Sequence, residues 1–105
     1  MNRNPRLSHL QFLVLGTLLQ GPRPGREIRE ALHRFGVKRS GPGFYQLMAR
    51  LEESSFVEGS YNQKVVEGQI IRERSYRLRA PGRTAWNHCR KFNETVIAEF
   101  GTSRA

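Results

Sequence analysis

The chain has 105 residues, of which 18 are Lys or Arg and 9 are Asp or Glu, so its formal net charge at pH 7 is +9. A chain of this length can form one domain with a modest core, and the charge favours a polyanionic partner, most often nucleic acid and less often an anionic membrane surface. Ribosomal and nucleoid proteins carry similar charges, so charge alone does not identify the partner. A single cysteine, Cys89, excludes a disulfide within the chain and indicates a reducing compartment. The N-terminal stretch lacks the features of a signal peptide, and no segment approaches the roughly 20 apolar residues of a membrane span, so we expect a cytoplasmic protein.

The first predicted helix covers residues 9–20 and follows a loose basic arm at residues 1–7. Ser8, followed three residues later by Gln11, is typical of a capping box at a helix start. The helix is apolar nearly all round, so we expect it to be buried on more than one side at the centre of the core. Gly16 interrupts the apolar run and indicates a place where another helix comes close.

A link rich in Gly and Pro at residues 21–25 ends this helix and begins the next, which is predicted over residues 24–35. Apolar residues recur there at i, i+3, i+4 and i+7 and indicate a buried face: Ile28, Ala31, Leu32 and Phe35. Gly36 is the predicted C-cap. Two short amphipathic helices joined by a few residues that include glycine resemble a helix-turn-helix.

The third predicted helix lies in S-G-P-G-F-Y-Q-L-M-A-R-L-E, residues 40–52. Ser40 and the Gly-Pro-Gly after it supply the turn and the start signal. Helical spacing again gives an apolar face: Phe44, Leu47, Met48 and Leu51. The opposite face carries one aromatic, one amide, one small residue and one cation: Tyr45, Gln46, Ala49 and Arg50. Such a face suits base edges and phosphates in a DNA groove, although a solvated helix face has a similar composition.

Two strands follow, predicted over residues 56–61 and 69–78, with a polar, turn-like tip at residues 62–68. The second strand alternates well, with one side formed by Ile70, Arg72, Arg74, Tyr76 and Leu78. A hairpin of this size must pack on the helices, because it is too small to be stable alone. Three helices followed by such a hairpin make a winged helix, an α+β fold that is mostly α. The basic residues of the hairpin either meet a phosphate backbone or lie on a solvated surface: Lys64, Arg72, Arg74 and Arg77.

A last helix is predicted over residues 81–100, and a coiled-coil spacing of 3, 4, 3, 4 runs along it. This seam consists of Trp86, Cys89, Asn93, Val96 and Phe100. A helix this long after a complete small domain has little left to cover in its own chain, so we interpret it as a dimerisation helix in which Asn93 fixes the register. The alternative is that the helix folds back on its own core. Our interpretation divides the chain into a winged-helix domain at residues 1–79 and a dimerisation helix with its tail at residues 80–105.

The sequence carries no enzyme signature, and no cofactor is expected. His88 and Cys89 are neighbours on one helix and do not face each other, and the other histidines are isolated, so neither a catalytic pair nor a metal site is expected. The Gly-Pro-Gly at residues 41–43 is too short for a phosphate loop. Glu52 and Glu53 are sequential rather than facing, and we expect Glu52 to contact a basic residue of the fold.

The order and spacing of these motifs resemble the PadR family of bacterial winged-helix transcriptional regulators, over about residues 7–100. The matching segments are L-S-H-L-Q-F-L-V-L-G-T-L (7–18), G-P-R-P-G-R-E-I (21–28), S-G-P-G-F-Y-Q-L-M-A-R-L-E (40–52) and R-S-Y-R-L (74–78), followed by Gly82. The resemblance implies a homodimeric repressor that reads DNA with its third helix and its wing. Carried over by position, the recognition-helix candidates are Ser40, Tyr45 and Arg50, and the wing candidates are Lys64, Arg72 and Arg74. Gln46 stands where the family usually has proline, and the last helix is short, as in a compact subgroup.

The sequence therefore predicts a DNA-binding transcriptional regulator, a repressor that binds double-stranded DNA at an inverted-repeat operator as a homodimer. Two other functions stay open. A winged helix used for protein contacts would meet an acidic protein with the same basic face. A small-molecule sensor would hold a planar aromatic effector between subunits, as some relatives do, with Trp86 and Phe92 either lining that space or forming ordinary interface core.

Overall fold

The first helix begins where the capping box predicts it. The structure is a computed structural model that describes residues 6–101, and in it α1 spans His9–Thr17. The Gln11 N–H donates to Ser8 Oγ at 3.0 Å, and the Ser8 N–H donates to Gln11 Oε1 at 2.9 Å, which confirms the capping box. The helix ends before the predicted residue 20, because the Leu18 N–H already bonds the carbonyl three residues back in a tighter turn.

The second helix, α2, spans Gly25–Arg34, and its apolar face is confirmed at three of the four predicted positions. The prediction for Phe35 is wrong, since this side chain is 69% exposed. Gly36, with a φ of +80°, turns the chain at the helix end so that the Val37 N–H donates to the Leu32 carbonyl oxygen at 3.0 Å. Val37 therefore packs against the core in place of Phe35.

The third helix, α3, spans Gly41–Glu53, and its predicted apolar face is buried in full. Ser40 is its N-cap: the Gly43 N–H donates to Ser40 Oγ at 3.0 Å. The hydroxyl oxygen of this predicted DNA-binding residue is thus used inside the fold as a helix cap, although Ser40 itself lies at the surface.

The hairpin is longer than predicted. β2 spans Val57–Val66 and β3 spans Gln69–Leu78, paired antiparallel along their whole length. The prediction of a turn-like tip at residues 62–68 is wrong, because the strands continue to a turn of two residues, Glu67 and Gly68. Both have positive φ, +52° and +80°, which matches the tight turn that suits the twist of a hairpin.

The sheet has a third strand that the sequence did not predict. β1 consists of Arg23–Pro24 and pairs antiparallel with β3, so the strand order is β1-β3-β2. It opposes Ser75 and Tyr76, which are both buried. The link between α1 and α2 is therefore fixed to the base of the hairpin. Two residues are too few for a strand pattern to be visible in the sequence.

The last helix, α4, spans Ala80–Val96 and continues in a π-helical turn, η1, at Ile97–Gly101, close to the predicted range. Its first turns join the core: Ala85 is 2% exposed, and the Trp86 ring stacks on Phe12 of α1 with ring centroids 5.1 Å apart. A Cβ at Gly16 would lie 3.3 Å from Trp86 Nε1, which confirms that Gly16 marks the close approach of another helix.

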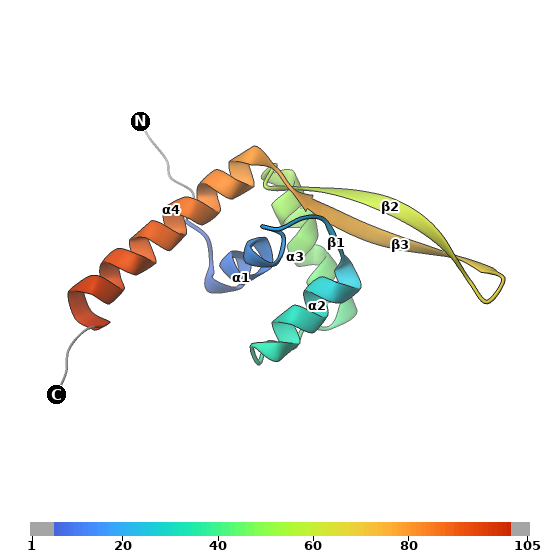
Figure 1. Ribbon diagram of the computed structural model, residues 1–105, viewed down its shortest axis with the longest axis horizontal. Coiled ribbons are helices and arrows are strands. Elements are labelled where there is room, and N and C mark those ends of the chain that lie inside the picture. Colours follow the sequence, from blue (N-terminus) through green and yellow to red (C-terminus); the bar gives the residue numbers. More distant parts are fainter. Residues whose placement is uncertain (1–5, 102–105) are drawn as a thin grey trace.

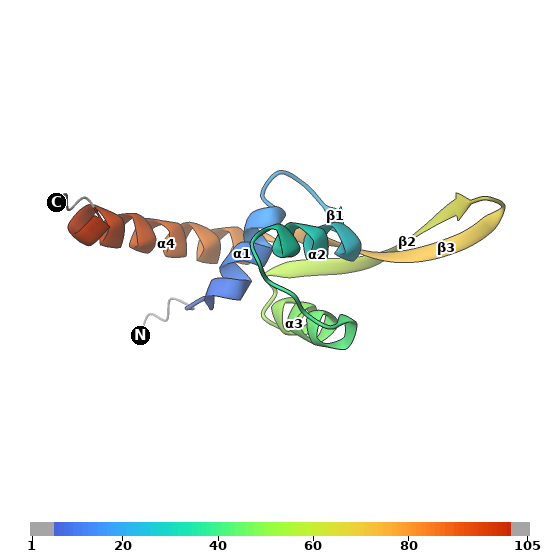
Figure 2. The same ribbon diagram turned by 90° about the horizontal axis from the view of Figure 1, so that it is seen from below.

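The helices α1, α2 and α3 surround the base of the hairpin, while the hairpin and α4 extend away from this body in opposite directions (Figure 1). Seen from below, α3 is set apart on one side of the hairpin base (Figure 2). The core comprises Val14, Leu15, Leu18, Ile28, Leu32, Phe44, Leu47, Met48, Leu51, Phe56, Val57, Tyr76 and Ala85. The protein is an α+β winged helix, mostly α, as predicted. Of the predicted arm at residues 1–7, residues 1–5 lie outside the described range.

Candidate nucleic-acid interface

The outer face of α3 carries the polar residues that the sequence singles out. Because the apolar stripe faces the core, Tyr45, Gln46 and Arg50 lie at the surface. The Tyr45 ring meets the Phe44 ring edge-on, with centroids 5.0 Å apart. A Cβ at Gly25 would lie 3.1 Å from the Tyr45 hydroxyl oxygen, so this tyrosine lies against the start of α2. The outer face of α3 is accessible to a partner, and the contacts with Phe44 and Gly25 fix the orientation of the Tyr45 side chain.

Two of the predicted wing cations have partners on the hairpin itself. Lys64 Nζ lies 3.2 Å from Glu73 Oε1, and Arg26 of α2 contributes a second cation at 3.2 Å from Glu73 Oε2. The hydrogen bond from Lys64, with the further bond and charge of Arg26, holds the pKa of Glu73 below its ordinary value of 4.5. The Arg72 guanidinium lies 4.5 Å from the centroid of the exposed Tyr61 ring. Glu73 thus ties the hairpin to α2, while Lys64 and Arg72 remain at the surface.

Arg74 is built into the base of the wing. Its guanidinium donates to Glu52 at 2.6 Å, and each side chain is 27% exposed, which confirms the predicted contact of Glu52 with a basic residue. Burial disfavours the charge of Arg74, but the hydrogen bond and charge of Glu52 outweigh it, so the pKa of Arg74 is raised. A Cβ at Gly59 would lie 2.5 Å from Glu52 Oε2, so glycine makes room for the pair. Beside it, burial raises the pKa of Tyr76 to about 12.

Replacing Glu52 with glutamine is expected to lower the free energy of unfolding by about 1–2 kcal/mol, because Arg74 then lies partly buried without its counter-charge. The matched control is Glu58→Gln, which removes the carboxylate from an exposed pair with Arg77 on the same hairpin. That change is expected to cost about 0.5 kcal/mol or less. Urea unfolding of both variants measures the difference, and equal effects would show that the Glu52 pair adds nothing to stability.

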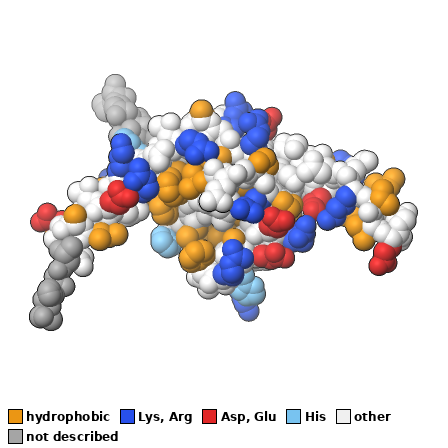
Figure 3. All heavy atoms as spheres, in the orientation of Figure 1, with side chains coloured by type: hydrophobic (Ala, Val, Ile, Leu, Met, Phe, Trp, Pro, Cys, Tyr) orange, Lys and Arg blue, Asp and Glu red, His pale blue; other side chains and the backbone are white. Residues whose placement is uncertain are grey.

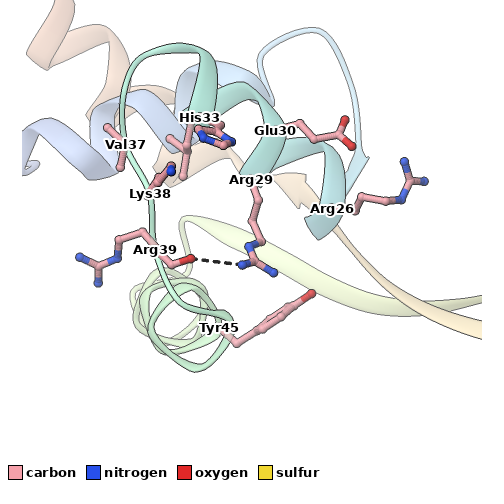
Figure 4. Close-up of a pocket in the computed structure, with 9 residues that line it drawn as sticks. Arg26, Arg29, Glu30, His33, Val37, Lys38, Arg39 and Tyr45 are labelled. Carbon is pink, nitrogen blue, oxygen red and sulfur yellow. Dashed lines mark hydrogen bonds between the residues drawn. The ribbon is translucent and has the colours of Figure 1, made fainter.

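A basic hollow of about 470 Å³ lies between α2, the connection at residues 35–40, and α3. Its lining carries four cations, one carboxylate, one imidazole and one phenol: Arg26, Arg29, Lys38, Arg39, Glu30, His33 and Tyr45. The Arg29 side chain extends from α2 toward α3, and its guanidinium donates to the Arg39 carbonyl oxygen at 3.1 Å (Figure 4). Of the predicted site residues, Tyr45 is the one that lines this hollow.

Sequence reasoning did not select Arg26, Arg29 and Lys38 as site residues, although a signal was present. Arg26 and Arg29 are three residues apart on the outer face of α2, so they share one side of that helix. Lys38 lies in the short connection that leads into α3. Cations on both sides of a helix-turn-helix connection must lie near each other, because the connection is short.

The predicted dimer seam divides into two parts. Trp86 faces its own α1, and Cys89 is half-buried, with its sulfur 3.6 Å from Asn93 Nδ2. Val96 is 37% and Phe100 is 72% exposed. A groove of about 640 Å³ runs between α1 and the outer part of α4, lined in part by Phe12, Cys89, Phe92 and Asn93. The inner end of the seam packs on the core, and the outer end is an exposed, largely apolar surface.

On the visible face, charged side chains lie over the body, α4 and the hairpin, and a group of apolar side chains lies at the hairpin tip (Figure 3). These exposed tip residues are Val65, Val66, Ile70 and Ile71. No helix within residues 6–101 combines the length and apolar character needed to cross a bilayer. Over the same residues, His, Cys, Asp and Glu side chains do not gather in threes as metal ligands.

Comparisons with known proteins give matches among solved structures. No protein-family model matches the chain, and no curated protein matches it. A PadR family transcription regulator from Clostridium difficile superposes with a TM-score of 0.71 at 18% identity, over 89% of this chain and 98% of that one. A transcriptional regulator from Clostridium thermocellum gives 0.65 at 21% identity, over 88% and 89% of the two chains. Bacillus subtilis PadR in complex with operator DNA gives 0.60 at 19% identity, over 77% of this chain and 46% of that one. The chain therefore has the winged-helix fold of PadR-family transcription regulators.

Proposed function

We propose that the protein is a PadR-family transcription regulator that binds double-stranded DNA as a homodimer. The observation that carries this proposal is the polar outer face of α3, set beside a basic hollow and a hairpin that carries cations at its surface. A shared fold with a protein solved on operator DNA supports it. In this proposal residues 1–79 bind DNA, and residues 80–105 supply the dimer contact.

In the proposed complex, α3 enters the major groove with its outer face toward the bases. Arg50 is suited to a bidentate contact with guanine, and Gln46 to the equivalent contact with adenine. Tyr45 offers a ring and a hydroxyl for contacts with a base edge or the backbone. Lys64 and Arg72 contact phosphates beside the groove, and this sequence-independent attraction weakens steeply with salt. Arg74 acts as a positioning residue, because its pair with Glu52 fixes the hairpin relative to α3.

The homodimer is proposed to form through the outer part of α4 and the η1 turn that follows it, where Asn93, Val96 and Phe100 are exposed. A two-fold axis between two α4 helices would present two α3 helices to the same duplex. The half-sites of an inverted repeat then lie one helical turn apart, about 34–36 Å, or a multiple of it. A dimer placed over a promoter blocks access to it, which is the reason for proposing a repressor.

The α3 surface is tested by the single variants Tyr45→Ala and Arg50→Ala. Each is expected to weaken operator binding about tenfold or more, because a lost base contact removes about 1–3 kcal/mol of discrimination. Neither should change thermal unfolding much, because both side chains are exposed. The operator comes from selection on a random DNA pool, and fluorescence anisotropy measures affinity. Arg34→Ala, an exposed cation of α2 outside the hollow, is the control. Wild-type affinity in both α3 variants would show that another surface reads the DNA.

A second candidate function is sensing of a planar aromatic compound, which the groove between α1 and α4 favours. This groove is lined by Phe12 and the exposed Phe92, and the Trp86 ring stacks against Phe12 nearby. A flat ligand between two subunits would stack on these rings. A saturable change in Trp86 emission on titration with planar aromatics would favour this function.

A further inference from the structure

We propose that the basic hollow between α2 and α3 is a binding site for one phosphate group of the DNA backbone. The ligands are the Arg29 guanidinium, the Lys38 ammonium and the Tyr45 hydroxyl, which come from α2, the connecting segment and α3. The inference rests on the proposed function and adds a contact that fixes where α3 sits in the groove.

Arg29 is held in place before any ligand binds. Its Nη2 donates to the Arg39 carbonyl oxygen at 3.1 Å, and its Cζ lies 5.8 Å from the centroid of the buried Phe44 ring. Its Nη1 lies 3.9 Å from the position that a Cβ would take at Gly41, so the guanidinium stands at the first residue of α3. The contact to Arg39 uses one of five N–H donors, and a guanidinium fixed in this way binds phosphate oxygens with little loss of side-chain entropy.

The electrostatics of the hollow favour an anion. Arg29 and Lys38 outweigh the carboxylate of Glu30, which lies at the side of the hollow, and Arg26 is already paired with Glu73 (Figure 4). The N-terminus of α3, a helix of 13 residues, adds a partial positive charge beside Arg29. The hydroxyl of Tyr45 points into the space between α2 and α3, where Arg29 also lies (Figure 4).

The position of the hollow identifies a backbone phosphate rather than a base. Tyr45 lies both in the lining of the hollow and on the outer face of α3. A phosphate held there would fix the start of α3 against one strand, while Gln46 and Arg50 stay free for base edges. Phosphate contacts of this kind position a helix and carry no sequence information. The contact therefore sets the register and contributes equally on every sequence.

The test compares Arg29→Gln and Lys38→Gln with the matched control Arg34→Gln, which removes the same charge from an exposed position of α2 outside the hollow. Anisotropy titrations with the selected operator and with an unrelated duplex are run at several salt concentrations. Each hollow variant is expected to weaken binding about tenfold on both duplexes and to reduce the slope of log affinity against log salt by roughly 0.9 for each bound subunit, the value for one phosphate contact. The control is expected to change both quantities much less. Lys38→Gln keeps the test valid if Arg29→Gln perturbs the fold.

Operators in which single phosphates are replaced by neutral methylphosphonates provide a second readout. One replacement per half-site should weaken the wild type about tenfold and should weaken the Lys38→Gln variant less, because that variant has already lost one of the three contacts to this phosphate. Additive losses at every position, or equal losses in the hollow variants and the control, would overturn the inference. A wild type that binds no duplex would instead overturn the proposed function, and the inference with it.

Free phosphate is the alternative source of the same chemistry. Inorganic phosphate, titrated at constant ionic strength, is expected to shift the NMR signals of the Arg29 side chain weakly, and to compete with DNA. Tight, saturable binding of inorganic phosphate that leaves DNA affinity unchanged would make the hollow a free-anion site and overturn its assignment to DNA.

Discussion

Replacing Gly82 with alanine is expected to lower the free energy of unfolding by about 3 kcal/mol, the largest stability loss that we predict for a single substitution. A Cβ at this position would overlap the Phe56 carbonyl oxygen and lie 2.9 Å from the carbonyl carbon and 3.0 Å from Leu78 Cδ1. Two of these three atoms belong to the backbone, so no change of rotamer relieves the overlap. The start of α4 must therefore move away from Phe56, the residue just before β2.

The control for this substitution is Gly41→Ala, which also adds a methyl group in the first turn of a helix. The nearest atom to a Cβ at Gly41 is Arg29 Nη1 at 3.9 Å, an ordinary contact. This variant should be as stable as the wild type or slightly more stable, because alanine favours the helix. Chemical unfolding of both variants gives the comparison. A Gly82→Ala protein with wild-type stability would show that α4 is not packed this closely.

Replacing Phe100 with glutamate is expected to raise the dissociation constant of the proposed homodimer by at least roughly 100-fold. The side chain is 72% exposed in the single chain, so its burial would come from a partner. A central aromatic residue of an interface commonly contributes about 2–4 kcal/mol, and in a two-fold dimer each substitution acts twice. Operator affinity should fall in parallel, because two half-sites then bind separately.

The control is Ala98→Glu, which places the same charge two residues away, on another side of the outer α4 region. It should leave the dimer intact. Sedimentation velocity at several concentrations measures the monomer–dimer equilibrium of both variants and the wild type. Monomers of the wild type at micromolar concentration, or equal effects of the two substitutions, would contradict the proposed role of α4.

Local patterns were sufficient to predict the helical part of the fold. The capping box at Ser8 and Gln11 and the apolar stripe of α3 depend on residues within one or two turns, and the structure confirms both. The predicted burial of Phe35 was wrong because Gly36 ends α2 and redirects the chain. Val37 therefore packs against the core in the place that helical spacing assigned to Phe35. The predicted length of the hairpin was wrong for a similar reason. The positive φ of Glu67, beside Gly68, makes a two-residue turn that the composition of the segment conceals.

The partners of the site residues could not be predicted, because they come from distant parts of the chain. Lys64 and Arg26 meet at Glu73, and Arg74 meets Glu52, through pairings that depend on strand register and helix packing. A basic residue in a wing can contact DNA, stabilise the fold, or do both, and composition does not separate these roles. The basic hollow was missed for the same reason, since α2 and α3 each supply a part of it.

The short junction between the hairpin and α4 couples the movements of these two elements. A single residue, Arg79, separates β3 from α4, and its N–H donates to the Phe56 carbonyl oxygen at 2.9 Å. With Gly82 packed on the same carbonyl, the pivot has little freedom to bend. In the proposed homodimer, a small tilt of α4 against the other subunit would therefore move the far end of the hairpin over a large distance. The crossing angle of two α4 helices would then control the distance between two wings, and with it the operators that the pair can span.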